Sequence, residues 1–245
     1  MSCLLYGIVV SPSDGQASPA LPAGVGGAPV RLLRERGLGA AVSTVNPHDL
    51  TPNVARALSY AKVVKALHAH RAVLPMRYGC AFGDEDQVIE LLRAHGGDYS
   101  AVLRGLNGCV EMGVRVLLPS GPPSPGFPPR SEMKGASGRA YLADRAARHA
   151  REEEDARALT AVMERLRGAL GGLAERTETD RNKPRADPRV SSLYFLIRRG
   201  AVEAFRRAFR QVERTESARL LLSGPWPPYN FVAPEGHWEQ PGPLI

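Results

Sequence analysis

A proline-rich stretch in the middle of the chain limits the folds that this sequence can adopt. Residues 119–130 read PSGPPSPGFPPR. Proline lacks a backbone N–H and fixes its own φ angle, so this stretch can form neither a helix nor a central strand. The 245 residues are enough for two ordinary domains. We therefore expect one domain over residues 1–118, a linker over 119–130, a second domain over 131–232, and a tail over 233–245.

The N-terminal half alternates β-rich runs with helical periodicity. Strands are expected at residues 4–10, 30–33, 38–45, 72–75 and 110–118. Residues 11–29 are rich in Gly, Pro, Ala and Ser and predict a mobile loop. Thr51 before Pro52 predicts a helix start, with the helix running to His70. This order of elements is that of a ferredoxin-like sandwich with additions.

Two further patterns in this half predict a helix and a half-buried strand. Asp84 and Gln87 have capping-box spacing, and Gly96-Gly97 would end the helix before a second short helix begins. In residues 110–118, alternation predicts that Glu111, Gly113 and Arg115 point outward and the apolar residues inward.

The C-terminal half has a different composition and predicts a long helix. From Ser137 the chain is rich in Ala, Arg and Glu, and an apolar stripe ends at Gly171-Gly172. Opposite charges at helical spacing in 148–157 indicate a solvated face rather than a nucleic-acid patch. Strands are expected at 174–179, 190–197 and 217–222, and a helix over 202–212. The predicted fold class is α+β, with two domains.

Composition narrows the function classes. The net charge of +7 raises the chance of an acidic partner without choosing among nucleic acid, an anionic membrane and a protein. Three widely spaced cysteines and six scattered histidines give no metal-ligand spacing. No nucleophile stands beside a base, so we expect no enzyme, no metal and no cofactor. The apolar start is too short to span a bilayer, and we expect an intracellular protein with reduced thiols.

An RNA- or anionic-surface-binding protein is the alternative from another class. Ferredoxin-like sheets that bind RNA stack bases on aromatic residues of their central strands. The candidate strands at 4–10 and 110–118 offer only Tyr6, which counts against this alternative.

Three segments together resemble the gas vesicle protein F/L family. The first is Val73 to Gly79, with Pro75, Arg77, Tyr78 and Gly79 matching the family's pattern. The second is Leu106 to Val114, where the matching residues are Gly108, Glu111 and Gly113. The third is Gly224 to Val232, where the matching residues include Gly224, Pro225, Pro227 and Pro228. The order of elements matches from Leu4 to Val232.

The resemblance implies a cytoplasmic accessory protein needed to assemble gas vesicles, the gas-filled protein shells that give cells buoyancy. Family members are thought to bind the small, very apolar main shell protein and other accessory proteins. The resemblance leaves open whether this chain is an adaptor or chaperone, or a minor component of the shell. It implies a ferredoxin-like N-terminal domain and an α+β C-terminal domain.

Two surfaces are our candidates for protein binding. The first consists of Trp226, Tyr229 and Phe231, aromatic side chains on a stiff proline backbone that could bind a partner or pack into the domain's own core. The second is an arginine face, which consists of Arg198, Arg199, Arg206, Arg207 and Arg210. For Arg77 and Glu111 we expect a structural role, as an ion pair or as hydrogen bonds that fix the sheet.

Overall fold

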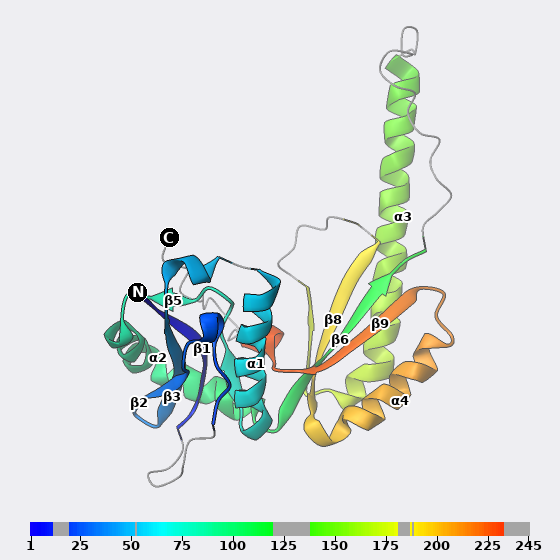
Figure 1. Ribbon diagram of the computed structural model, residues 1–245. Helices are drawn as coiled ribbons and strands as arrows, with labels where there is room; N and C mark the ends of the chain where they lie inside the picture. The colour runs from blue at the N-terminus through cyan, green and yellow to red at the C-terminus, as the bar shows by residue number, and fades with distance from the viewer. Residues whose placement is uncertain (12–19, 52, 120–137, 181–186, 188, 233–245) are drawn as a thin grey trace. The chain divides into compact units, whose positions relative to one another are not determined.

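The computed structural model describes residues 1–11, 20–51, 53–119, 138–180, 187 and 189–232 (Figure 1). It has the α+β class that the sequence predicts, with antiparallel strands and separate helices. The chain divides into two compact units. Unit 1 comprises Met1–Glu111, Leu196–Arg199 and the chain from Gly224, and unit 2 comprises Met112–Phe195 and Gly200–Ser223. The expected linker and tail, residues 119–130 and 233–245, lie almost entirely outside the described residues.

Unit 1 is built on an antiparallel sheet with two long helices. Its strands follow the order β2-β3-β1-β4, and β5 also pairs with β1. The strands are β1 Ser2–Val10, β2 Arg31–Glu35, β3 Leu38–Val45, β4 Val73–Pro75 and β5 Ala81–Phe82. The helices are α1 Val54–His70 and α2 Glu85–Leu106, and both contact β1. Because β1 is the central strand, its residues from Cys3 to Val9 are buried.

Two expected helix boundaries are wrong. Helix α1 is capped by Asn53, whose side chain accepts the Arg56 N–H at 2.9 Å, and Thr51 instead ends a short 3₁₀ turn over Pro47–Leu50. Helix α2 does not stop at Gly96-Gly97. It continues to Leu106, because Tyr99, Leu103 and Leu106 prolong its buried face and keep the helix packed. The predicted cap at Asp84 is confirmed, since its side chain accepts the Gln87 N–H at 3.0 Å.

The second half of the expected loop over residues 11–29 is packed into unit 1. A short 3₁₀ turn, η1 Val25–Gly27, places Val25 in the core at 0% exposure, and Leu21, Ala28 and Val30 pack against the same cluster. The Val25 N–H donates to the Tyr6 hydroxyl at 2.9 Å, and that hydroxyl lies 2.8 Å from the Ser43 hydroxyl. Residues 12–19 lie outside the described residues.

Unit 2 contains most of a second, four-stranded sheet and the long helix α3. The strand order is β7-β8-β6-β9. The strands are β6 Cys109–Leu117, β7 Arg176–Thr179, β8 Val190–Arg198 and β9 Arg219–Trp226. The helices are α3 Gly138–Leu170 and α4 Val202–Glu213. Short 3₁₀ turns follow at η3 Gly171–Leu173 and η4 Arg199–Ala201.

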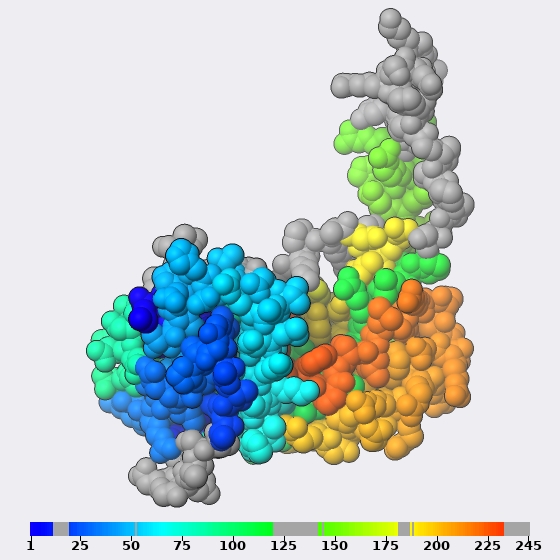
Figure 2. All heavy atoms as spheres, in the orientation of Figure 1, coloured from blue at the N-terminus to red at the C-terminus, as the bar shows by residue number. Residues whose placement is uncertain are grey.

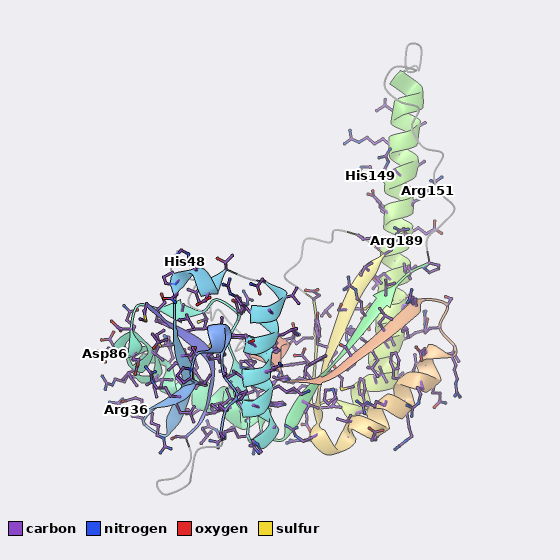
Figure 3. All side chains as sticks on the ribbon, in the orientation of Figure 1. Arg36, His48, Asp86, His149, Arg151 and Arg189 are labelled. Atoms are coloured by element: carbon purple, nitrogen blue, oxygen red, sulfur yellow. The ribbon has the colours of Figure 1, made fainter. Side chains whose placement is uncertain are left out.

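The two halves of α3 differ as the sequence predicts. The apolar stripe is buried and consists of Leu159, Val162, Met163, Leu166 and Leu170. Residues 145–154 in its first half are exposed, and His149 and Arg151 project from it (Figure 3). Arg157 bonds Glu153 at 3.1 Å, one of the predicted pairs on a solvated face. No helix among the described residues is long and apolar enough to cross a membrane.

The domain ranges expected from the sequence differ from the two units. Strand β6 crosses from unit 1 to unit 2 between Glu111 and Met112, and Leu196–Arg199 and the chain from Gly224 join unit 1. A single boundary at the proline-rich stretch assigns Leu196–Arg199 and the chain from Gly224 to the second domain, whereas the structure groups both segments with unit 1. The ranges 1–118 and 131–232 therefore stay predictions.

Candidate functional site

The segment Val73–Gly79 consists of strand β4 and a turn after it, and tyrosine hydroxyls hydrogen-bond to the backbone in this region. The Tyr60 hydroxyl, from α1, donates to the Met76 carbonyl oxygen at 2.9 Å and lies 3.2 Å from that of Arg77. Tyr78 donates to the Asp49 carbonyl at 2.9 Å, and its ring meets Tyr60 edge-on at 5.3 Å. Gly79 has φ +90°, a conformation that favours glycine. Pro75, Tyr78 and Gly79 thus build the fold, while the Arg77 side chain is exposed.

Glu111 is buried, which corrects the expectation that it points outward. It is 4% exposed, and its carboxylate accepts the Asn230 backbone N–H at 2.8 Å and the Asn230 side-chain amide at 2.7 Å. Burial raises the pKa of Glu111, and the two Asn230 hydrogen bonds partly oppose that rise. The partner of Glu111 is therefore Asn230 rather than Arg77. Alternation failed here because β6 is buried on both faces through Val114.

The glycines of the second and third matching segments have separate backbone reasons. Gly108 has φ +72° in the turn between α2 and β6, and Gly224 has φ +107° before Pro225. Gly113 is constrained by space, since a Cβ there would come 2.8 Å from the Ser223 hydroxyl on β9. Glycine at position 113 therefore allows β6 and β9 to approach closely.

The aromatic residues of the third segment divide into one buried side chain and two exposed ones. Phe231 is 1% exposed, and Pro227 and Pro228 are also buried. Trp226 is 48% exposed and Tyr229 is 37% exposed. The end of β9 and the segment after it, orange to red in Figure 2, reach the surface in that view. The core-packing alternative therefore describes Phe231, and only Trp226 and Tyr229 remain candidates for binding.

Tyr229 is only partly exposed, and its phenol is affected by burial. Burial and, to a smaller extent, the Glu111 charge raise the pKa of Tyr229 to about 12. The phenol therefore stays neutral at physiological pH. Tyr229 can present its partly exposed ring to a partner, and its phenol lies within electrostatic reach of Glu111.

The residues of the expected arginine face have different hydrogen-bond and ion-pair partners, and their role in binding stays a prediction. Arg198 donates to the Asn107 carbonyl at 3.1 Å, and Arg199 donates to the His68 carbonyl at 2.9 Å. These two residues bind backbone within unit 1. On α4, Arg206 pairs with Glu203 at 2.7 Å. Arg207 and Arg210 are the members that are exposed on α4 without a described ion pair.

His68 is a buried residue that is not among the site residues predicted from the sequence. It is 6% exposed at the end of α1, and its Nδ1 has no hydrogen-bond partner among the described residues. Burial lowers the pKa of His68 to about 4, and the Arg199 charge lowers it in the same direction. The folded protein therefore favours the neutral form of the His68 imidazole.

We expect His68 to make the protein less stable in mild acid. Its folded pKa is below the unfolded value of about 6.5, so the stability it contributes is present above pH 6.5 and is lost as the pH falls toward 4. Urea unfolding at pH 7.5 and pH 5.0 measures this loss. His68→Gln, which keeps an acceptor for Arg199, should make the free energy of unfolding less pH-dependent. An unchanged dependence in that variant contradicts the prediction.

The described residues hold no metal-ligand cluster, and their cysteine thiols are buried. They contain no group of three or more His, Cys, Asp or Glu side chains placed to hold a metal ion. Cys3, Cys80 and Cys109 are buried free thiols. Burial raises the pKa of Cys3 to about 11 and that of Cys80 to about 12, so both are poor nucleophiles.

Comparisons with known proteins agree with one another over nearly the whole chain. Residues 2–233 match the family model described as gas vesicle synthesis protein GvpL/GvpF. Gas vesicle protein F of Streptomyces sp. (strain CB03234) is 30% identical and covers 95% of this chain and 100% of its own length. Gas vesicle protein L of the same strain is 32% identical, covering 91% of this chain and 90% of its own.

Solved structures with lower identity share the fold. The crystal structure of gas vesicle protein GvpF from Anabaena sp. PCC7120 has a TM-score of 0.72 at 17% identity, covering 96% of this chain and 99% of its own. GvpF from Microcystis aeruginosa has a TM-score of 0.69 at 14% identity, covering 95% and 99%. At these identities the likeness concerns the fold alone.

Proposed function

This chain belongs to the gas vesicle synthesis protein GvpL/GvpF family, and from that premise we propose that it assists assembly by binding the apolar main shell protein through Trp226 and Tyr229. Its place in the family gives it a role in gas vesicles. The finer role proposed here is that of a cytoplasmic, non-catalytic partner of the shell protein and of other accessory proteins. It would serve as an adaptor or chaperone, or remain as a minor shell component.

A physical need supports this role. A shell subunit that presents a dry face to gas exposes apolar surface before it is assembled, and such surface promotes aggregation. A partner that covers this surface has to offer apolar area of its own without being insoluble. Trp and Tyr suit that task, because each combines a large apolar ring with a polar atom.

The observation that carries the proposal is the exposure of Trp226 beside a buried Phe231. Large aromatic side chains are normally buried in a fold, yet Trp226 keeps 48% of its surface exposed at the end of β9. The backbone on either side of it is restricted by Pro225 and Pro227. A rigid aromatic side chain loses little conformational entropy when a partner covers it.

The test is the affinity of Trp226→Ala for the main shell protein, supplied as a fusion to a solubility tag. We expect the affinity to fall at least tenfold, a typical loss at a binding hot spot, while the free energy of unfolding changes by less than about 1 kcal/mol. The matched control is Leu58→Ala, which removes an apolar side chain that is 58% exposed on α1. Equal affinities for Trp226→Ala and the control would exclude Trp226 from the binding surface.

The position of Tyr6 in unit 1 does not support the RNA-binding alternative. Tyr6, the aromatic residue that the candidate strands offered, is 0% exposed and its hydroxyl is bonded inside the core. It cannot stack on a base without unfolding the sheet. Treating the binding reaction with nuclease tests the same point, because loss of binding after digestion would favour a nucleic-acid partner.

A further inference from the structure

A buried carboxylate fixes the segment that carries the two exposed aromatic side chains. Glu111 receives hydrogen bonds from the backbone and from the side chain of the same residue, Asn230, at 2.8 and 2.7 Å. Two bonds to one residue restrict both its main chain and its side-chain torsions. Among the described residues, these are the hydrogen bonds that the Glu111 carboxylate receives, so its solvation inside unit 1 depends on Asn230.

The restriction of Asn230 is transmitted to the aromatic pair through a short, stiff backbone. Tyr229 directly precedes Asn230, and its N–H donates to the Pro227 carbonyl at 2.8 Å. The Phe231 N–H donates to the Pro228 carbonyl at 3.2 Å. Pro227 and Pro228 have fixed φ angles and are buried. Trp226, the last residue of β9, therefore directly precedes a turn that Glu111 holds in place.

We propose that Glu111 is a positioning residue for the shell-protein binding surface, acting through Asn230 to hold Trp226 and Tyr229 in their binding arrangement. This inference rests on the proposed function. Glu111 does not touch the partner. Its effect is to order the aromatic pair before binding, so that the complex does not bear the entropic cost of ordering it.

Two substitutions separate the hydrogen bonds from the charge. Glu111→Ala removes both acceptors, and the turn over residues 227–231 loses its attachment to β6. Glu111→Gln keeps one acceptor for the Asn230 N–H, and the Asn230 amide can turn over so that its oxygen accepts from the new side chain. We expect Glu111→Ala to weaken shell-protein binding about tenfold and Glu111→Gln to bind like the original protein.

A spectroscopic readout makes the inference testable without the partner. With Trp238 replaced by Phe, the fluorescence of Trp226 reports its surroundings in the free protein. Glu111→Ala should shift the emission to longer wavelength and increase quenching by acrylamide, while Glu111→Gln should change neither. The control Glu216→Ala breaks the 2.6 Å ion pair with Arg165 in unit 2. That control should leave both the emission and the affinity unchanged.

The outcomes distinguish the two proposals. Positioning by these hydrogen bonds is overturned if Glu111→Ala leaves the emission and the affinity as they were, or if Glu111→Gln is as defective as Glu111→Ala. In either case, a loss of affinity in Trp226→Ala still supports the binding surface. If Trp226→Ala itself binds normally, the proposed function is overturned, and the role of Glu111 in binding is overturned with it.

Discussion

Replacing Gly24 by alanine is expected to destabilise the protein by about 3 kcal/mol. A Cβ built on Gly24 would overlap the Tyr6 hydroxyl and would come 3.0 Å from the ring carbon that carries it. The Tyr6 hydroxyl cannot move without breaking its bonds to Ser43 and to the Val25 N–H, at 2.8 and 2.9 Å. The substitution therefore either breaks these buried bonds or displaces Val25 from the core.

A double-mutant cycle in urea identifies the cause of that loss. Tyr6→Phe removes the colliding oxygen, so Gly24→Ala should cost clearly less in the Tyr6→Phe background, with a coupling energy of about 1–2 kcal/mol. The matched control is Gly97→Ala, because Gly97 is exposed inside α2 and a Cβ there meets nothing within 4 Å. That control should be neutral or stabilising, by up to about 1 kcal/mol. Additive costs for Gly24→Ala and Tyr6→Phe would show that the two groups do not collide.

Gly24 and Gly97 also show where sequence reasoning succeeds and where it stops. Glycine is a strong local signal, so Gly96-Gly97 predicted a helix end and residues 11–29 predicted a mobile loop. In the structure the buried face from Val88 to Leu106 outweighs the two glycines, and Val25 is packed in the core. Both differences have one cause. Tertiary packing overrides local propensity, and packing partners distant in sequence are not visible in a single chain.

Periodicity succeeded where one element packs on one face. The stripe from Leu159 to Leu170 was predicted from its spacing and is buried, and Phe205 and Phe209 are buried on α4. It failed on β6, because a strand covered on both faces has no outward position for Glu111. The burial of a Glu in such a strand can be predicted only when its hydrogen-bond partner is known, and Asn230 lies 119 residues away in the sequence.

The candidate site was predicted in part. The sequence selected the segment from Gly224 to Val232, but it could not assign Trp226 and Tyr229 to the surface and Phe231 to the core, because the prolines remove any regular period. The hydrogen-bond partners of the expected arginine face were also hidden in the sequence. Arg198 ends β8 and Arg199 follows it, and they donate to the carbonyls of Asn107 and His68, which lie far away in the sequence.

Phe231→Ala is expected to have the largest effect on stability within the candidate site, a loss of about 3–5 kcal/mol in the free energy of unfolding. Phe231 is 1% exposed, and Val232 beside it is 7% exposed, so truncation leaves a cavity that the turn held by Glu111 cannot close. Thermal and urea unfolding measure the loss. Phe231→Leu, which keeps most of the volume, should recover the larger part of it.

The comparison of Phe231→Ala with Trp226→Ala separates the core of this segment from its surface. Phe231→Ala should lose stability. At a temperature where this variant is still folded, its affinity for the shell protein should fall only if the turn is disturbed. The second variant should keep its stability and lose affinity, because its side chain is half exposed. If both variants lose stability equally, Trp226 belongs to the core. The segment would then close unit 1 rather than bind a partner, and the aromatic surface would have to be sought elsewhere.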